Sequence, residues 1–423
     1  MSDIAQINQL LDHLFRRESG KLVSILTRIF GPENIDLAED VVQDALSEAI
    51  GQWIYNGIPR NPAGWLYKVA KNKALNILNR EKYKKKYSSI LINSEKKYEP
   101  DLDYFFSEQE IKDDQLRMMF ICCHPALSTD SQIAFTLKTL CGFNIPEIAR
   151  AFLSTEENIH KRLVRARQKI REAGIPFELP EAGELQSRSE AVLQTIYLLF
   201  NEGYSASGGN DLIRYELCEE SIRLAEIIAT HQAIQDKSNA YALLSLMLFN
   251  ASRFHARQDE QGNILPMSLQ DRSKWSGALI ERAFYYLDKN SSSENVSAYH
   301  ILAAISAHHC AAANFDSTNW HNILFLYDNL LQIDRSPIVL LNRSIALSKV
   351  KGARSALEEL EKIQNNCFLE SYYLFHATKA ELYMELNKFA EAASSLQYAL
   401  VLAPIKAEKD LLQKKLEACQ EKI

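Results

Sequence analysis

The basic side chains of residues 155–171, TEENIHKRLVRARQKIR, form the pattern in this sequence that best fits a binding chemistry. The chain as a whole is acidic, with a formal net charge of −6, so this concentration of Arg and Lys stands apart from its composition. Guanidinium and ammonium groups bind phosphates, and an Arg can also donate two hydrogen bonds to one base edge. The candidate DNA-contacting residues are Thr155, Asn158, His160, Lys161, Arg162, Arg165 and Arg167.

The residues around this stretch predict a helix-turn-helix. Asn144 can cap a first helix, Glu147 completes a capping box three residues later, and Pro146 fits the first turn. Ser154 and Glu157 repeat the capping pattern at the start of a second helix. A basic second helix in this motif suits the major groove of DNA. The alternative is a charged helix exposed to solvent in a bundle, but two capping boxes at the spacing of a turn favour DNA.

A second basic segment, residues 65–86, reads WLYKVAKNKALNILNREKYKKK and places aromatic residues between cations. Aromatic rings can stack on unpaired bases while Lys and Arg follow the phosphates, so the segment suits single-stranded nucleic acid. Trp65 and Tyr67 fit an alternative interpretation equally well, because both could pack in the hydrophobic core.

Other reactive residues fit structural roles better than catalysis. Cys122, Cys123 and His124 are adjacent, which prevents the usual zinc chelate, so we expect buried thiols. Glu157 and His160 have the Glu-x-x-His spacing of di-iron bundles, but no second pair of this kind is evident. The sequence also lacks a Walker motif, a GxSxG motif and an HExxH motif. We therefore expect no enzyme activity, no metal and no cofactor.

Length and composition indicate a soluble globular protein. The 423 residues suffice for roughly two to four domains, with 47 % hydrophobic and 24 % charged residues. No apolar run approaches the roughly 18 residues of a membrane span, and the first residues, MSDIAQINQL, lack the features of a signal peptide. Seven cysteines without a paired spacing indicate reduced thiols, so we expect a cytoplasmic protein. Apolar residues recur at intervals of three and four, which predicts an all-α fold.

Changes in composition divide the chain into four segments. The first begins with an acidic helix and ends with a basic one, whereas the second is an acidic linker without a sustained apolar face. The third ends with the basic stretch described first, and GIPFELPEAG (174–183) separates it from a long helical region. The predicted segments are 1–87, 88–113, 114–175 and 185–423.

The long C-terminal region contains a weak internal repeat with tetratricopeptide spacing. Its clearest copy, residues 373–404, places the small residues Ala380 and Ala392 where paired helices would approach closely. An earlier copy has Ala346 at the position of Ala380, and its loop is predicted to be two residues shorter. We expect residues 296–332 to add a further pair. Paired helices of this kind stack and form a concave groove.

Residues 1–175 resemble an RNA polymerase sigma factor of the extracytoplasmic-function group. DLAEDVVQDALSEAIGQW (36–53) resembles the helix that docks on the polymerase clamp, and NPAGWLYKVAKNKALNILNREKYKKK (61–86) resembles the segment that opens and reads the −10 element. Residues 115–171 resemble the domain that reads the −35 element. Phrases along nearly the whole chain, among them ICCHPALS, YLLFNEGYSAS and LYDNLLQIDRSPIVLLNRSIAL, are similar to one subgroup with a long, tetratricopeptide-like C-terminal extension.

The resemblance implies roles for named residues of this sequence. The −35 readers would be the residues of 155–167 named above, and an acidic group would meet a basic surface of polymerase. The acidic linker could occupy the channel that nascent RNA later takes, and catalysis would belong to polymerase. The implied −10 contacts are Asn61, Trp65, Lys68, Lys71, Asn72, Arg80, Lys84 and Lys85, and the implied polymerase contacts are Glu39, Asp40, Asp44 and Glu48.

The predicted function is therefore that of a sigma factor, which binds core RNA polymerase and promoter DNA and directs transcription initiation. We expect the C-terminal helical region to control this activity, with a protein partner or the chain's own sigma domains in its groove. One alternative is a helix-turn-helix regulator with a tetratricopeptide sensor that is not a polymerase subunit. A tetratricopeptide adaptor without a DNA role is disfavoured by the two separate basic segments.

Overall fold

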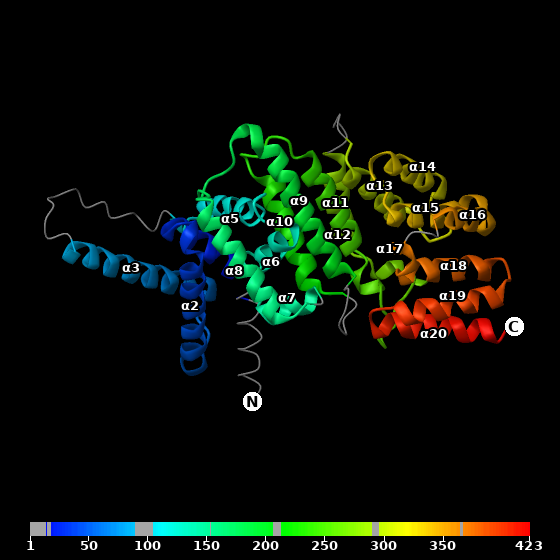
Figure 1. Ribbon diagram of the computed structural model, residues 1–423, viewed down its shortest axis with the longest axis horizontal. Helices are drawn as coiled ribbons and strands as arrows, with labels where there is room; N and C mark the ends of the chain where they lie inside the picture. The colour runs from blue at the N-terminus through cyan, green and yellow to red at the C-terminus, as the bar shows by residue number, and fades with distance from the viewer. Residues whose placement is uncertain are drawn as a thin grey trace. The chain divides into compact units, whose positions relative to one another are not determined.

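The protein is helical throughout the part of the chain that the computed structural model describes, apart from one isolated bridge between Gln258 and Ile264 (Figure 1). This confirms the all-α prediction. None of the described helices combines the length and the hydropathy needed to cross a bilayer. The described residues are 14, 18–88, 105–152, 154–205, 213–289, 296–363 and 367–423.

The chain forms two compact units. Unit 1 contains residues 1–195 and 230–234, and unit 2 contains residues 196–229 and 235–423. Both candidate DNA-binding segments lie in unit 1, whereas the predicted helical repeat lies in unit 2.

Unit 1 begins, among the described residues, with a helix over residues 18–30. Most of the predicted acidic linker lies outside the described residues, but its last part belongs to a helix that begins at Glu108. The remaining elements of unit 1 are η1 (Pro32–Asn34), α2 (Ile35–Asn56), α3 (Pro62–Ser88), α5 (Glu108–Cys122), α6 (Thr129–Thr139), α7 (Ile145–Ala151), α8 (Glu156–Glu172) and the first part of α9 (Ala182–Tyr204).

Local signals explain how α2 ends and α3 begins. Gly57 has a φ of 78°, a conformation that favours glycine, and its N–H donates to the Trp53 carbonyl at 3.0 Å. The Asn61 side chain then accepts a hydrogen bond from the Gly64 N–H at 2.9 Å, in the first turn of α3. Trp53 and Trp65 meet edge to face at 5.4 Å and hold the two helices together at this corner. The C-terminal part of α3 projects beyond α2 (Figure 1).

The adjacent cysteines of unit 1 are packed in its core. Cys122 and Cys123 are 0 % and 2 % exposed, beside the fully buried Phe120. Burial raises the pKa of both thiols, and that of Cys123 reaches about 11. The prediction that these residues are buried thiols is confirmed.

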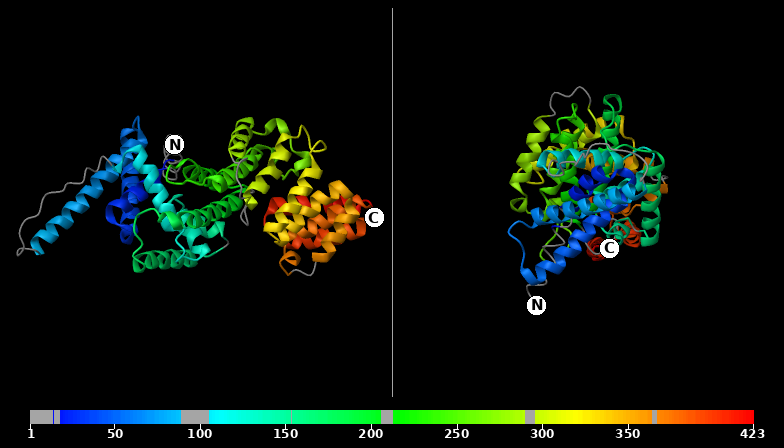
Figure 2. Two further views of the ribbon diagram at one scale, coloured as in Figure 1. Left: turned by 90° about the horizontal axis from the view of Figure 1, so that it is seen from above. Right: turned by 90° about the vertical axis from the view of Figure 1, so that its left-hand side faces the viewer.

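Unit 2 continues the helical architecture through successive antiparallel pairs. Figure 2 shows its last helices stacked side by side, in colours from yellow to red. The elements are the second part of α9, then α10 (Tyr215–Thr230), α11 (Ser238–Ala251), η2 (Phe254–Ala256), η3 (Met267–Leu269), η4 (Arg272–Lys274), α12 (Gly277–Asp288), α13 (Ala298–Ala311), α14 (Trp320–Ile333), α15 (Pro337–Lys351), α16 (Ala353–Ile363), α17 (Cys367–Glu370), α18 (Tyr373–Glu385), α19 (Phe389–Leu402) and α20 (Lys406–Gln420).

The predicted repeat corresponds to observed helix pairs. One residue, Gly352, joins α15 to α16, whereas residues 386–388 join α18 to α19, so the earlier loop is two residues shorter, as predicted. The predicted pair in residues 296–332 is formed by α13 and α14. Ala380 and Ala392 are both 0 % exposed at the contact between α18 and α19. Their small side chains allow the two backbones to approach closely.

We predict that Ala392→Leu lowers the free energy of unfolding of unit 2 by about 1–3 kcal/mol, because the larger side chain must displace packed neighbours. Denaturant unfolding followed by circular dichroism measures the change. Ser394→Leu, at an exposed position of the same helix, is the matched control and should have little effect. Equal stability of the two variants would contradict the close packing of α18 and α19.

Candidate nucleic-acid interface

The helix-turn-helix is formed by α7 and α8. The Asn144 N–H donates to Glu147 Oε2 at 2.8 Å, and Asn144 Oδ1 accepts from the Glu147 N–H at 2.9 Å, which confirms the first capping box. The second cap differs from the prediction. Thr155, rather than Ser154, caps α8 and accepts from the Asn158 N–H at 3.2 Å. Glu157 is therefore not a capping-box partner of Ser154.

One face of α8 is buried and the other carries the cations. Ile159, Leu163, Ala166 and Ile170 are at most 1 % exposed, and their spacing of four, three and four residues places them on one side of the helix. The charged residues between them must lie on the remaining faces. Burial of the apolar stripe thus fixes which side of α8 a nucleic acid could reach.

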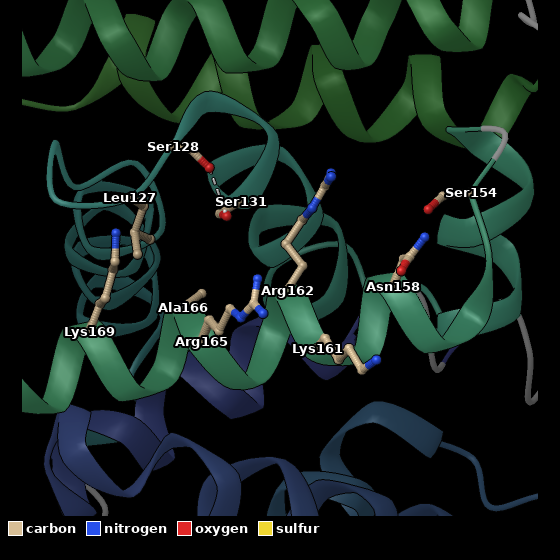
Figure 3. A pocket seen from close by; sticks show the side chains of 10 residues that line it. All are labelled: Leu127, Ser128, Ser131, Ser154, Asn158, Lys161, Arg162, Arg165, Ala166 and Lys169. Atoms are coloured by element: carbon tan, nitrogen blue, oxygen red, sulfur yellow. Dashed lines mark hydrogen bonds between the residues drawn. The ribbon is translucent and has the colours of Figure 1, made fainter.

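The accessible side of α8 borders a hollow of about 580 Å³ (Figure 3). Side chains from α8 form one wall, and the start of α6 forms the opposite wall. Arg162 projects from α8 toward the side where Ser128 and Ser131 lie. Cations and hydroxyl donors facing one hollow can bind the phosphates of a nucleic-acid backbone. The lining residues are Leu127, Ser128, Ser131, Ser154, Asn158, Lys161, Arg162, Arg165, Ala166 and Lys169.

The cations around this hollow differ in how firmly the protein holds them. Arg162 is half-buried and contacts Asp130 of α6 at 3.3 Å, so its guanidinium has a defined direction. Lys169 donates to the Ala126 carbonyl at 3.2 Å. Lys161 pairs with Glu157 at 2.6 Å, one helical turn away, and both side chains are exposed. Arg165 is exposed and lines the same hollow.

Arg167 lies on a different side of α8 from the hollow. Only 14 % of its side chain is exposed, because it follows Leu163 by four residues and so lies beside the buried stripe. Its guanidinium contacts Asp36 at 2.9 Å and Glu39 at 2.6 Å, both on α2. In this arrangement Arg167 neutralises protein carboxylates, so a contact with DNA requires these ion pairs to break.

The acidic residues predicted to bind polymerase lie in two kinds of environment. Asp40 and Asp44 are exposed on α2, whereas Glu48 pairs with Lys73 of α3 at 3.1 Å. Glu39 is buried and also accepts a hydrogen bond from the Thr139 hydroxyl at 3.2 Å. Burial raises the pKa of Glu39, although Arg167 opposes this effect. Of the predicted polymerase contacts on α2, Asp40 and Asp44 are therefore the exposed ones, whereas Glu39 is not accessible.

The candidate single-strand contacts are distributed along α3 and differ in their exposure. Lys68 and Asn72 are exposed one turn apart, Trp65 is half-buried against Trp53, and Arg80 is exposed further along the helix. Asn61 is exposed and caps α3, and Lys71 is half-buried. The side chains of Lys84 and Lys85 lie outside the described part of the chain.

The structure adds residues that the sequence interpretation missed. Ser128 and Ser131 share the hollow with Arg162, and their sequence signal was the start of a helix at LST (127–129). Lys169 also lines the hollow; it belongs to the basic stretch but was not among the candidate contacts. At the end of α2, Tyr55 is 87 % exposed, beside the partly exposed Ile58. The exposed ring of Tyr55, just before the turn at Gly57, can stack on an unpaired base. The sequence signal for this residue was an aromatic side chain two positions before a glycine.

The arrangement supports binding of a polyanion. Within the described residues, no group of three or more His, Cys, Asp or Glu side chains could hold a metal ion. The cations of α8 and α3 instead provide two separate surfaces, one bordered by a helix-turn-helix and one by aromatic side chains.

Comparisons with known proteins match three parts of the chain. Residues 14–83 match the family model described as sigma-70 region 2, and residues 117–170 match sigma-70, region 4. Residues 188–291 match a family of unknown function, DUF6596. An uncharacterized protein of Rhizobium meliloti (strain 1021) is 34 % identical over 385 residues, which cover 91 % of this chain and 90 % of that protein. No solved structure matches the chain.

We predict that Arg165→Ala weakens binding to duplex DNA of any sequence, because the exposed guanidinium lines the hollow and pairs with no carboxylate of the described residues. The slope of log affinity against log salt should fall by about one, as expected for one lost phosphate contact. Fluorescence anisotropy over a salt series measures both effects. Arg354→Ala, which removes an exposed arginine of unit 2, is the control. An unchanged slope for Arg165→Ala would argue against this side of α8 as the DNA-facing side.

Proposed function

We propose that this chain, which matches sigma-70 regions 2 and 4, is a sigma factor of the extracytoplasmic-function group whose C-terminal unit controls its activity. The protein recruits core RNA polymerase to promoters and separates the DNA strands at the start of transcription. Polymerase supplies the catalytic site for RNA synthesis.

This proposal rests mainly on one observation: each of the two sigma-70 matches contains its own cationic surface. The region 2 match contains α2 and α3, and the region 4 match contains the helix-turn-helix with α8. A simple repressor of the helix-turn-helix type needs only the second surface. A factor that also opens DNA needs a surface for unpaired bases, which the half-buried Trp65 and the exposed basic side chains of α3 can supply.

The cations of α8 have different tasks in this proposal. Asp130 directs the guanidinium of Arg162, and a directed guanidinium suits a bidentate contact with a base of the −35 element. Arg165 and Lys169 face the same hollow and suit phosphates, which set register without reading sequence. On α2, the exposed carboxylates of Asp40 and Asp44 suit a basic surface of polymerase.

The direct test is to mix the protein with core polymerase and follow co-elution and promoter-dependent transcripts. We predict that a Lys68→Ala, Arg80→Ala double variant still co-elutes but forms several-fold fewer open complexes, because α3 loses two cations beside the unpaired strand. Permanganate reactivity of the −10 thymines measures opening. Lys112→Ala, an exposed residue of α5, is the control. Normal thymine reactivity in the double variant would refute the role of α3.

Unit 2 supplies a groove suited to a regulatory partner. The groove has a volume of about 660 Å³ and runs along helices α14, α15, α18 and α20. The α15 residues that line it are spaced by three, one and three positions, so they share one helix face. They are Asn342, Ile345, Ala346 and Lys349.

The chemistry of this groove favours a peptide with an apolar anchor. Phe315, Trp320 and Tyr327 provide an aromatic surface inside it. At the rim, Lys349 pairs with Glu385 at 2.8 Å, and Lys415 pairs with Glu381. An apolar interior with balanced charges at its edge can bury one large side chain and hold the flanking backbone or charged residues of a peptide. We assign this site, in a tetratricopeptide-like role, to a segment of a protein partner.

We predict that Ile345→Asp lowers promoter-dependent transcription in cells by at least about tenfold, because a carboxylate in the apolar groove prevents burial of the anchor. Ile345 is 38 % exposed in the unbound protein, so the change should leave the fold intact. Circular dichroism checks folding, and Val401→Asp, at an 82 % exposed apolar residue outside the groove, is the control. If the folded Ile345→Asp protein transcribed at the wild-type level, the groove would not be the binding site of a regulatory partner.

A further inference from the structure

Unit 2 contains a buried arginine whose contacts are neutral groups rather than carboxylates. Arg253, which follows α11, is only 9 % exposed. Its Nη2 donates to the Tyr204 hydroxyl at 2.7 Å and to Asn250 Oδ1 at 2.8 Å. Arg253 forms no ion pair with a carboxylate of the described residues. Because a buried charge without an opposite charge is costly, an anion beside this guanidinium would be stabilised.

A second arginine, Arg272 of η4, uses only part of its guanidinium. Its Nη1 donates to the carbonyl oxygens of His309 at 2.6 Å and Ala312 at 2.7 Å, so the end of α13 fixes its direction. Its Nη2 is buried and has no hydrogen-bond partner among the described residues. Buried donors in folded proteins are nearly always satisfied, so this Nη2 favours an acceptor supplied by a ligand.

Trp275 lies beside both arginines and adds a further donor. The centre of its ring is 4.4 Å from Arg272 Cζ and 5.9 Å from Arg253 Cζ. The side chain is 7 % exposed, and its Nε1 is buried without a partner in the described part of the chain. An indole N–H and a guanidinium can only donate hydrogen bonds. The cluster therefore fits a ligand that is rich in acceptors.

The ionisation of neighbouring groups shows that the electrostatic potential around this cluster is positive. Burial, together with Arg253 and Arg272, lowers the pKa of His309 to about 4, so its imidazole is neutral at neutral pH. Burial and the charge of Arg253 also lower the pKa of Arg272. Two guanidinium groups that repel each other in this way gain stability when an anion binds beside them.

We propose that Arg253, Arg272 and Trp275 form a binding site for a compact oxyanion of the phosphate class. Two guanidinium groups neutralise a dianion, and the indole N–H can donate to a further oxygen of a tetrahedral group. A carboxylate has one charge and two oxygens, so it would use fewer of these donors. The ligand is either the free phosphate ion or the phosphate group of a small metabolite. All three residues belong to unit 2, so the site does not depend on the proposed sigma-factor role.

The site borders the groove that the proposed function gives to a partner peptide. His309 lines the groove, and its carbonyl oxygen accepts a hydrogen bond from Arg272. Leu269, three residues before Arg272, lines the groove as well. A ligand that holds Arg272 thus acts on the wall of the groove. The oxyanion is accordingly a small-molecule effector of the same regulatory unit.

The test uses the full-length protein, labelled with ¹⁵N in its four tryptophans, and inorganic phosphate as the probe. The indole resonance of Trp275, identified by its loss in Trp275→Phe, should shift with phosphate. The resonances of Trp53 and Trp65 in unit 1 should not shift. Calorimetric titration gives the Kd, with chloride at equal ionic strength as the salt control. Phosphate at ten times this Kd should raise the Tm by about 2–5 °C.

Two variants remove the donors separately. Trp275→Phe keeps an aromatic ring and removes the N–H, so affinity for phosphate should fall about tenfold, as for one lost hydrogen bond to a charged group. Arg272→Gln removes a charge and should lower affinity about a hundredfold. Arg354→Gln, which removes an exposed arginine of unit 2, is the matched control and should bind as the wild type does. Circular dichroism checks folding, and if one variant does not fold, the other decides.

A parallel titration with glycerol phosphate distinguishes the two sources of the ligand. Tighter binding than inorganic phosphate identifies a metabolite ester, and equal or weaker binding identifies the free ion. The proposal is wrong if the wild-type protein binds neither compound. It is also wrong if folded Trp275→Phe and Arg272→Gln both keep the wild-type affinity, because phosphate then binds elsewhere. Promoter-dependent transcription is not measured here, so the proposed function and the oxyanion site can fail independently.

Discussion

The buried carboxylate of Glu39 is the constraint on which the arrangement of unit 1 depends. A charge removed from water is costly unless a partner and hydrogen bonds replace its hydration. Arg167 provides the opposite charge and Thr139 provides a hydroxyl, and both come from the helix-turn-helix domain. The position of α8 on α2 therefore follows from an electrostatic requirement of α2 itself, and the candidate DNA-binding surface of α8 is oriented as a consequence.

The two units hold their helices together by different means. In unit 1, charged residues far apart in sequence form ion pairs between helices, such as Arg167 with Glu39 and Arg28 with Asp114, and removal of one partner leaves the other buried carboxylate uncompensated. In unit 2, neighbouring helices pack through alanines such as Ala356, Ala380 and Ala392, which are fully buried.

The parts of the structure that the sequence predicted depend on local contacts. The Asn144 capping box and the shorter loop at Gly352 follow from residues a few positions apart, and both were predictable. The cap of α8 was misplaced by one residue because Ser154 and Thr155 are equally good capping types, and only the backbone distinguishes them. The ion pair between Glu39 and Arg167 joins residues 128 positions apart. The helical pattern shows that Arg167 borders the apolar stripe. No local signal in the sequence identifies Glu39 as its partner.

The buried cysteines of region 4 have a consequence for redox chemistry. With its pKa raised to about 11, Cys123 is a thiolate in roughly one molecule in ten thousand at neutral pH, and only the thiolate reacts quickly with oxidants or alkylating agents. Cys122 is equally enclosed, at the end of α5, which packs on α6. Modification of these sulfurs must therefore wait for the domain to open. The rate at which a thiol reagent modifies these two cysteines therefore reports local unfolding of the helix-turn-helix domain.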